Sequence, residues 1–203
     1  MATFVRLTLT LLLTLNSVQL IADTLTIPKI GYLVRYDTHL GVPILTDYVL
    51  PRSMLKRSAS RKGIDFYPDR VLPAPQVDPA CYRRSGYDRG HNVPAADRVG
   101  NAMCLVETFA MSNISPQTPE FNRHQWKNVE ILVRKLAKKF GTVRVITRPL
   151  WCRPDTIWLP CHHVAVPDGF QKQVFRWPTN QLILDTILWQ RRNNREESET
   201  TTR

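Results

Sequence analysis

Long hydrophobic runs and acidic side chains are both scarce in this sequence of 203 residues. Beyond the first 22 residues no apolar run is long enough for a transmembrane helix, so we expect no stable association with a membrane. The 17 acidic residues are outnumbered by 28 lysines and arginines, which gives a net charge of +11. A basic excess of this size favours a polyanionic partner such as nucleic acid or an anionic membrane surface. A basic protein without such a partner would have the same composition.

The sequence contains no internal repeat, and its length suits a single domain with its own hydrophobic core. The apolar content of 43% and the charged content of 22% are both ordinary for a globular protein. We therefore predict three parts: a signal peptide over residues 1–22, one folded domain over 23–190, and a polar, disordered tail over 191–203.

The N-terminal 22 residues have the composition of a secretory signal peptide. Arg6 is their only charged residue, and a short apolar run follows it from Leu7 to Leu15. Cleavage after Ala22 would release the chain, although Leu20, at the third position before the cut, is larger than such sites prefer. We predict a secreted or periplasmic protein. An uncleaved N-terminal anchor is the alternative.

Cysteine occurs only four times, at Cys81, Cys104, Cys152 and Cys161. An even number of cysteines in an exported chain is typical of disulfides, and four cysteines allow three pairings. We expect the near-neighbour pairing, Cys81 with Cys104 and Cys152 with Cys161. The first of these bonds would close a loop around residues 88–91. Four reduced, buried thiols are the alternative, expected if the N-terminal segment is not a signal peptide.

The hydrophobic pattern predicts both strands and a helix. Apolar residues recur every third or fourth position after Asn122, which indicates a helix with Asn122 near its N-cap and Gly141 at its C-cap. The other segments are strands over 25–50, an irregular connection over 51–80, a mostly buried strand within 102–117, and two strands within 142–152 and 161–175.

One short polar segment could carry chemistry. "SGYDRGHNVPAAD" (85–97) places an acid, an arginine, a glycine and a histidine next to one another at residues 88–91. Hydrolysis of a phosphodiester requires a base that takes a proton from water and a cation that neutralises the charge growing on the phosphate. A neutral imidazole can be the base, an arginine can bind phosphate with two hydrogen bonds, and Mg²⁺ accepts a single protein oxygen as ligand.

Two further blocks stand downstream of that segment, "SNISPQ" (112–117) and "FNRHQWKNVE" (121–130). The three blocks together resemble the DNA/RNA non-specific endonuclease family, whose members include endonuclease G. The clear resemblance covers residues 85–133. It implies an α+β fold, with a central antiparallel sheet and a ββα-metal finger that carries the active site. Residues 23–190 would then be the catalytic domain.

The resemblance implies roles for four residues of the first and third blocks. His91 would be the general base that activates water, and Asn122 would be the single direct protein ligand of Mg²⁺ (or Mn²⁺). Arg89 would contact the phosphate and stabilise the transition state. Asp88 would orient the local turn or a metal-bound water.

Three more positions follow from the same resemblance. Asn113 would help to hold the histidine loop and the scissile phosphate, and Glu130 would hydrogen-bond to a water on the metal. Eight helical residues rise about 12 Å, so Glu130 could not share a ligand sphere directly with Asn122. Arg61, in "SASRKGIDF", matches an upstream phosphate-binding arginine, although the spacing there is loose.

The resemblance therefore predicts an exported, Mg²⁺-dependent endonuclease that cuts DNA and RNA with little sequence preference and leaves a 5′-phosphate. A homodimer and a protein inhibitor are compatible with it. The sequence departs from the family at Arg148, where the family usually has glycine, and the chain after Phe175 is short.

Two other functions remain open at this point. One is a catalytically inactive, nucleic-acid-binding protein derived from the same fold. The other is a secreted zinc protein built on Cys152, Cys161, His162 and His163. Consecutive strand residues point to opposite faces, so His162 and His163 would be poor joint ligands.

Overall fold

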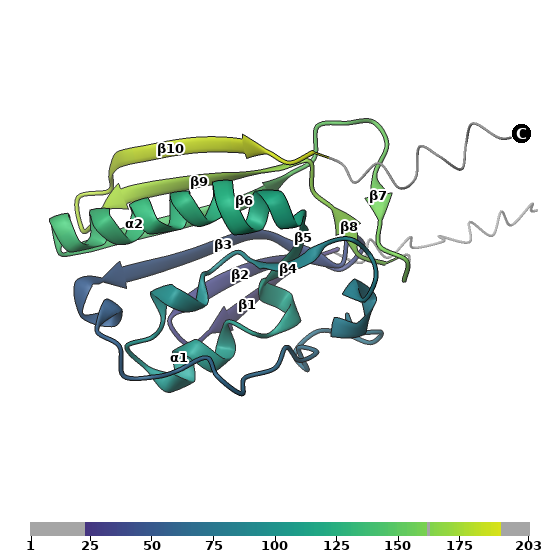
Figure 1. Ribbon diagram of the computed structural model, residues 1–203, viewed down its shortest axis with the longest axis horizontal. Helices are drawn as coiled ribbons and strands as arrows, with labels where there is room; N and C mark the ends of the chain where they lie inside the picture. The colour runs from purple at the N-terminus through teal and green to yellow at the C-terminus, as the bar shows by residue number, and fades with distance from the viewer. Residues whose placement is uncertain (1–22, 162, 192–203) are drawn as a thin grey trace, which may run out of the picture.

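The computed structural model describes residues 23–161 and 163–191. The predicted signal peptide and all of the predicted tail after residue 191 lie outside them. A six-stranded antiparallel sheet with the order β1-β2-β3-β6-β9-β10 forms the centre of the domain (Figure 1). Its strands are β1 (Thr24–Lys29), β2 (Tyr32–Asp37), β3 (Val42–Pro51), β6 (Thr142–Leu150), β9 (Gly169–Arg176) and β10 (Gln181–Trp189). The predicted α+β class with a central antiparallel sheet is confirmed.

The sheet forms because apolar side chains alternate along its strands and collect on one face. Tyr32, Val34 and Tyr36 of β2 are buried, and so are Val143 and Val145 of β6. All five belong to the largest hydrophobic core of the protein. The tight connection between β1 and β2 turns at Gly31, whose φ of +83° is a conformation that glycine adopts without strain.

Helix α2 (Lys127–Phe140) covers this face and runs alongside β6 and β9 (Figure 1). Val133 and Ala137 are its buried residues, and both belong to the same core as the strands. The helix ends at Gly141 with a φ of +83°, as predicted from the sequence. The cationic residues of its last turn, Lys138 and Lys139, are exposed and complement the helix dipole.

The predicted N-cap of this helix is wrong. Asn122 lies inside a π-helical turn, η5 (Phe121–Trp126), that runs directly into α2, and its N–H donates to the Thr118 carbonyl. The helical backbone already begins at Pro119, where a missing N–H costs nothing, and the Thr118 hydroxyl accepts a hydrogen bond from the N–H of Phe121. Asn122 is therefore a residue of the first helical turn, and its side chain does not cap the helix.

A second, two-stranded sheet pairs β4 (Asp88–His91) with β5 (Ile114–Gln117) in antiparallel register. The predicted buried strand over 102–117 is correct only for β5. Its first part folds as helix α1 (Ala102–Glu107), because the side chain of Asn101 caps that helix by accepting from the N–H of Cys104. Strands β4 and β5 and the helix that follows them make up the predicted ββα unit.

The remaining elements are short. Strands β7 (Ile157–Trp158) and β8 (Ala165–Val166) form a small third sheet. The described residues also form 3₁₀ turns at η1 (Arg52–Leu55), η2 (Pro79–Tyr82), η3 (Ala95–Asp97) and η4 (Met111–Asn113). Over residues 23–161 and 163–191, no helix has the length and apolar character that crossing a bilayer requires.

The predicted disulfide pairing is wrong in this structure, where all four cysteines are free. Cys104 is buried in α1, and both its sulfur and the guanidinium of Arg98 lie close to Gly31. Cys81 instead packs in the same hydrophobic cluster as Cys161. Proximity along the chain favours near-neighbour pairs, whereas the fold brings together Cys81 and Cys161, which are 80 positions apart.

Candidate active site

A cleft of about 560 Å³ opens between β4, the connection before it and the start of the long helix. Six of the seven site residues predicted from the sequence line this cleft: Arg61, Asp88, Arg89, His91, Asn122 and Glu130. The ββα unit brings them together, because β4 carries three of them and the helical segment from Phe121 carries two. Arg61, the position with the loosest sequence match, comes from the irregular connection and also faces the cleft.

The glycine of the Asp-Arg-Gly-His segment has a packing role. Gly90 is buried, and a Cβ at this position would collide with the buried side chain of Gln117 on β5. Only a residue without a side chain lets β4 lie this close to its partner strand. Gly90 thereby fixes the position of His91, the next residue.

His91 occupies an aromatic pocket. Its ring lies 5.4 Å from the ring of Phe66 and 5.1 Å from the ring of Phe109, measured between centroids. Burial, with a further contribution from the positive charge of Arg61, lowers the pKa of His91 to about 3. The imidazole is therefore neutral at neutral pH. Its Nε2 is buried without a hydrogen-bond partner among the residues that the structure describes, so a basic nitrogen is kept free.

This burial makes a pH-dependent contribution to stability. In the unfolded chain the histidine takes up a proton near pH 6.5, but in the folded protein only near pH 3. Between these values the unfolded state binds more protons, so stability falls as the pH is lowered through this window. We expect the loss to approach about 1.4 kcal/mol per pH unit.

Urea unfolding of wild type and His91→Ala across this window tests the expectation. The difference in unfolding free energy between the two proteins should shrink as the pH falls. His124→Ala, which removes an exposed imidazole outside the aromatic pocket, provides the control. If the difference in unfolding free energy between wild type and His91→Ala stays constant from pH 6.5 to pH 3, the lowered pKa of His91 is contradicted.

Asp88 connects the strand to the helix. Its Oδ2 accepts hydrogen bonds from Asn122 Nδ2 and Arg123 Nε, both at 2.9 Å, and its Oδ1 accepts from Arg123 Nη2 at 2.8 Å. Burial alone would raise the pKa of Asp88, but these hydrogen bonds outweigh it and hold the pKa below its ordinary value. The sequence assigns Asp88 to orienting the local turn or a metal-bound water; in the structure its carboxylate holds the side chains of Asn122 and Arg123.

Because Asp88 engages the amide nitrogen of Asn122, the amide oxygen is left as the group that could bind a cation. An uncharged oxygen of this kind is a hard ligand, as Mg²⁺ and Mn²⁺ prefer. The carboxylates of Asp88 and Glu130 line the same cleft. The side chains present therefore fit a hydrated divalent ion.

Glu130 lies in a network of charged groups at the base of the cleft. Burial raises the pKa of Glu130, while the positive charges of Lys172 and Arg134 act in the opposite direction. Arg134 Nη1 lies 2.9 Å from Asp97 Oδ1 and 3.9 Å from Glu130 Oε2. Asp97 is fully buried and also accepts a 2.6 Å hydrogen bond from the hydroxyl of Tyr48, so it is a structural residue.

Asn113 is the exception among the predicted site residues. It is fully buried and does not line the cleft. Its Oδ1 accepts from the N–H of Val93, and its Nδ2 donates to the carbonyls of Val93 and Thr108. The amide therefore holds the chain just after His91, as predicted, but the predicted contact with the scissile phosphate is wrong because no group of this side chain is left to make it.

Sequence reasoning missed several residues of the cleft: Phe66, Arg123, Lys127 and Arg134 line it, and Phe109 supports the histidine. Arg123 and Arg134 had detectable signals, the first beside Asn122 and the second four residues after Glu130 on the same helix. The two phenylalanines had none, because an aromatic residue in a connection is equally compatible with general core packing.

Fold and site together define a ββα nuclease-like domain with a basic cleft. The sequence model described as DNA/RNA non-specific endonuclease matches residues 16–196, and this chain belongs to that family. Nuclease C1 of Cunninghamella echinulata var. echinulata is 48% identical over 128 residues, which are 60% of this chain and 50% of that protein. The mitochondrial nuclease of Saccharomyces cerevisiae is 41% identical over 107 residues, or 52% of this chain and 32% of that protein.

The fold has a solved counterpart in a structure described as "Crystal structure of the EndoG/EndoGI complex: Mechanism of EndoG inhibition". The match has a TM-score of 0.77 and 27% sequence identity, and it covers 82% of this chain and 74% of that chain. The matches to the two nucleases are shorter. This chain spans 50% of the length of nuclease C1 and 32% of the length of the Saccharomyces cerevisiae nuclease.

Proposed function

We propose that this protein is an endonuclease that hydrolyses phosphodiester bonds of DNA and RNA with little sequence preference. The observation that carries the proposal is the pairing of two groups in one cleft: a neutral histidine with an unpartnered ring nitrogen, and an asparagine whose amide oxygen is directed away from its carboxylate partner. A base and a metal ligand in one basic cleft are the parts that hydrolysis of a phosphodiester requires.

His91 would accept the proton of the attacking water, because its low pKa leaves the imidazole unprotonated. The guanidinium groups of Arg61 and Arg89 would bind the phosphate. Both lie over aromatic rings, Arg61 at 5.9 Å from the Phe109 centroid and Arg89 at 4.9 Å from that of Phe66. Such stacking restricts each side chain and directs the cation toward the cleft. Contacts to phosphates carry no base information, which accounts for low sequence preference.

Asn122 would hold a Mg²⁺ (or Mn²⁺) ion, with its amide turned by the hydrogen bond to Asp88. When bound, such an ion neutralises the charge that develops on the phosphate and on the leaving oxygen. Arg123 neutralises the carboxylate of Asp88 through two hydrogen bonds, so this acid does not repel the phosphate.

Export to the outside of the cell or to the periplasm is part of the proposal. It depends on the apolar run after Arg6 and on the net positive charge, which suits a secreted enzyme that captures nucleic acid. We also propose that a protein inhibitor could cover the cleft, since the solved counterpart was crystallised with one. A homodimer remains compatible with the fold. N-terminal sequencing of the mature protein would test export, and a start at residue 23 is expected.

The test of the activity is direct. The purified protein is incubated with plasmid DNA and with RNA, in Mg²⁺, in Mn²⁺ and in EDTA. We expect both substrates to be cut in Mg²⁺ and neither in EDTA. Intact substrates in both Mg²⁺ and Mn²⁺ would overturn the proposal. Binding without cleavage would then support the alternative, a catalytically inactive nucleic-acid-binding protein.

A further inference from the structure

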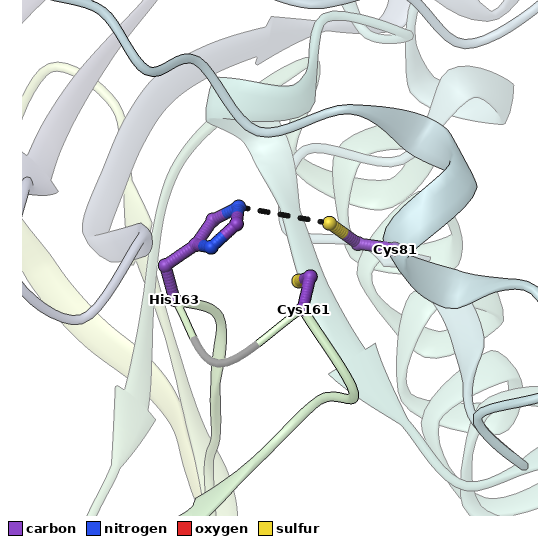
Figure 2. Close-up of side chains that lie close together, drawn as sticks. All are labelled: Cys81, Cys161 and His163. Atoms are coloured by element: carbon purple, nitrogen blue, oxygen red, sulfur yellow. Dashed lines mark hydrogen bonds between the residues drawn. The ribbon is translucent and has the colours of Figure 1, made fainter.

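Three metal-binding side chains from distant parts of the sequence converge on the side of the domain where the small β7–β8 sheet lies. Cys81 comes from the turn η2, while Cys161 and His163 come from the connection between β7 and β8. Figure 2 shows the His163 ring directed toward the sulfur of Cys81, with the sulfur of Cys161 close by. Cys81 Sγ lies 3.8 Å from His163 Nε2, and the three ligand atoms all lie within 4.8 Å of one another.

This spacing suits a tetrahedral metal ion. In a zinc site with Zn–S near 2.3 Å and Zn–N near 2.0 Å, ligand atoms lie about 3.5–3.8 Å from one another. The sulfur–nitrogen distance here is of that size. Thiolates and an imidazole are soft or intermediate ligands that select Zn²⁺ over Mg²⁺. We propose that Cys81, Cys161 and His163 bind Zn²⁺, with a solvent molecule in the fourth position.

A disulfide between Cys81 and Cys161 is the competing chemistry. It would use both sulfurs but would leave the imidazole of His163 beside them without a function. The ring nitrogen directed at the Cys81 sulfur is the observation that favours a metal, because it adds a third ligand of the correct type. His163 is exposed, so water can reach the open position.

The zinc hypothesis drawn from the sequence is thereby revised. Its ligand set included Cys152, which is exposed and does not belong to the cluster, and lacked Cys81. Cys161 and His163 are retained, and His162 lies outside the described residues. Only the fold supplies Cys81, because this residue is 80 positions away from Cys161.

The proposed site is separate from the nuclease cleft, since none of its three residues lines that cleft. It lies, however, on the segment that leads into it. Cys81 and Cys161 pack in one hydrophobic cluster with Tyr82 and Tyr87, and β4 begins at the residue after Tyr87. A zinc ion here would tie the turn before β4 to the β7–β8 connection and would stabilise the approach to the active-site strand.

The experiment is metal and thiol analysis of the purified full chain, prepared without chelators and with a tag that binds no metal. We expect about one Zn²⁺ per chain. We also expect four titratable thiols after denaturation in EDTA. Cys81→Ser and His163→Ala should both lose the zinc and lower the melting temperature by on the order of 5 °C. Cys152→Ser is the matched control and should retain it.

Three results would overturn the proposal. The first is two missing thiols without metal, which would indicate a Cys81–Cys161 disulfide. The second is protein that neither contains zinc nor gains thermal stability when Zn²⁺ is added. The third is a zinc content that is unchanged in the His163→Ala variant. Since His163 is exposed, this variant is expected to fold and decides the question even where Cys81→Ser does not fold.

Discussion

Replacing His91 by alanine is expected to slow the cleavage of DNA and RNA by about 10²–10⁴-fold, the usual contribution of a general base. The neutral imidazole is the only group in the described part of the cleft that combines a depressed pKa with an unpartnered basic nitrogen. Arg61, Arg89 and the remaining cations of the cleft are unchanged in this variant, so its affinity for nucleic acid should stay close to that of wild type. Cleavage rates at saturating Mg²⁺ and binding in EDTA measure the two properties separately.

The control is His124→Ala. His124 is exposed, with its Nε2 at 3.8 Å from Glu120 Oε2, and it does not line the cleft, so its loss should leave cleavage unchanged. Circular dichroism must show that the His91 variant is folded, because the substitution leaves a space between Phe66 and Phe109. A folded His91→Ala protein that cuts at the wild-type rate would refute the assignment of the base.

Replacing Asn122 by alanine is expected to raise the Mg²⁺ concentration needed for half-maximal cleavage by at least about tenfold. The variant removes the oxygen proposed to hold the ion, and it also leaves Asp88 without one of its hydrogen bonds. Cleavage measured over a Mg²⁺ titration separates a loss of metal affinity, which high Mg²⁺ compensates, from a loss of the chemical step. Asn128→Ala, an exposed asparagine on α2, is the matched control. An unchanged Mg²⁺ requirement would show that the ion is held elsewhere.

Several features of this protein could be predicted from its sequence because they depend on neighbouring residues. Strands with alternating apolar residues and a helix that ends at Gly141 follow from local periodicity and backbone conformation. The segment from Asp88 to His91 and the block around Asn122 could be recognised because their residue types and their order match a family. The same reasoning failed at the helix start, where Pro119 and Thr118 determine the first turn before Asn122 is reached.

By itself, then, the sequence determined the class of fold, the family and six of the residues that line the cleft. The tertiary structure alone decided which distant side chains meet: Arg61 with His91, Asn113 with the chain after the histidine, and Cys81 with Cys161 and His163. Local sequence patterns indicate which backbone conformation a short segment of the chain prefers. They do not record where two segments 80 positions apart come together, because that depends on how the whole sheet and its connections pack. The free nitrogen of His91 and the cysteine–histidine cluster are both products of that packing.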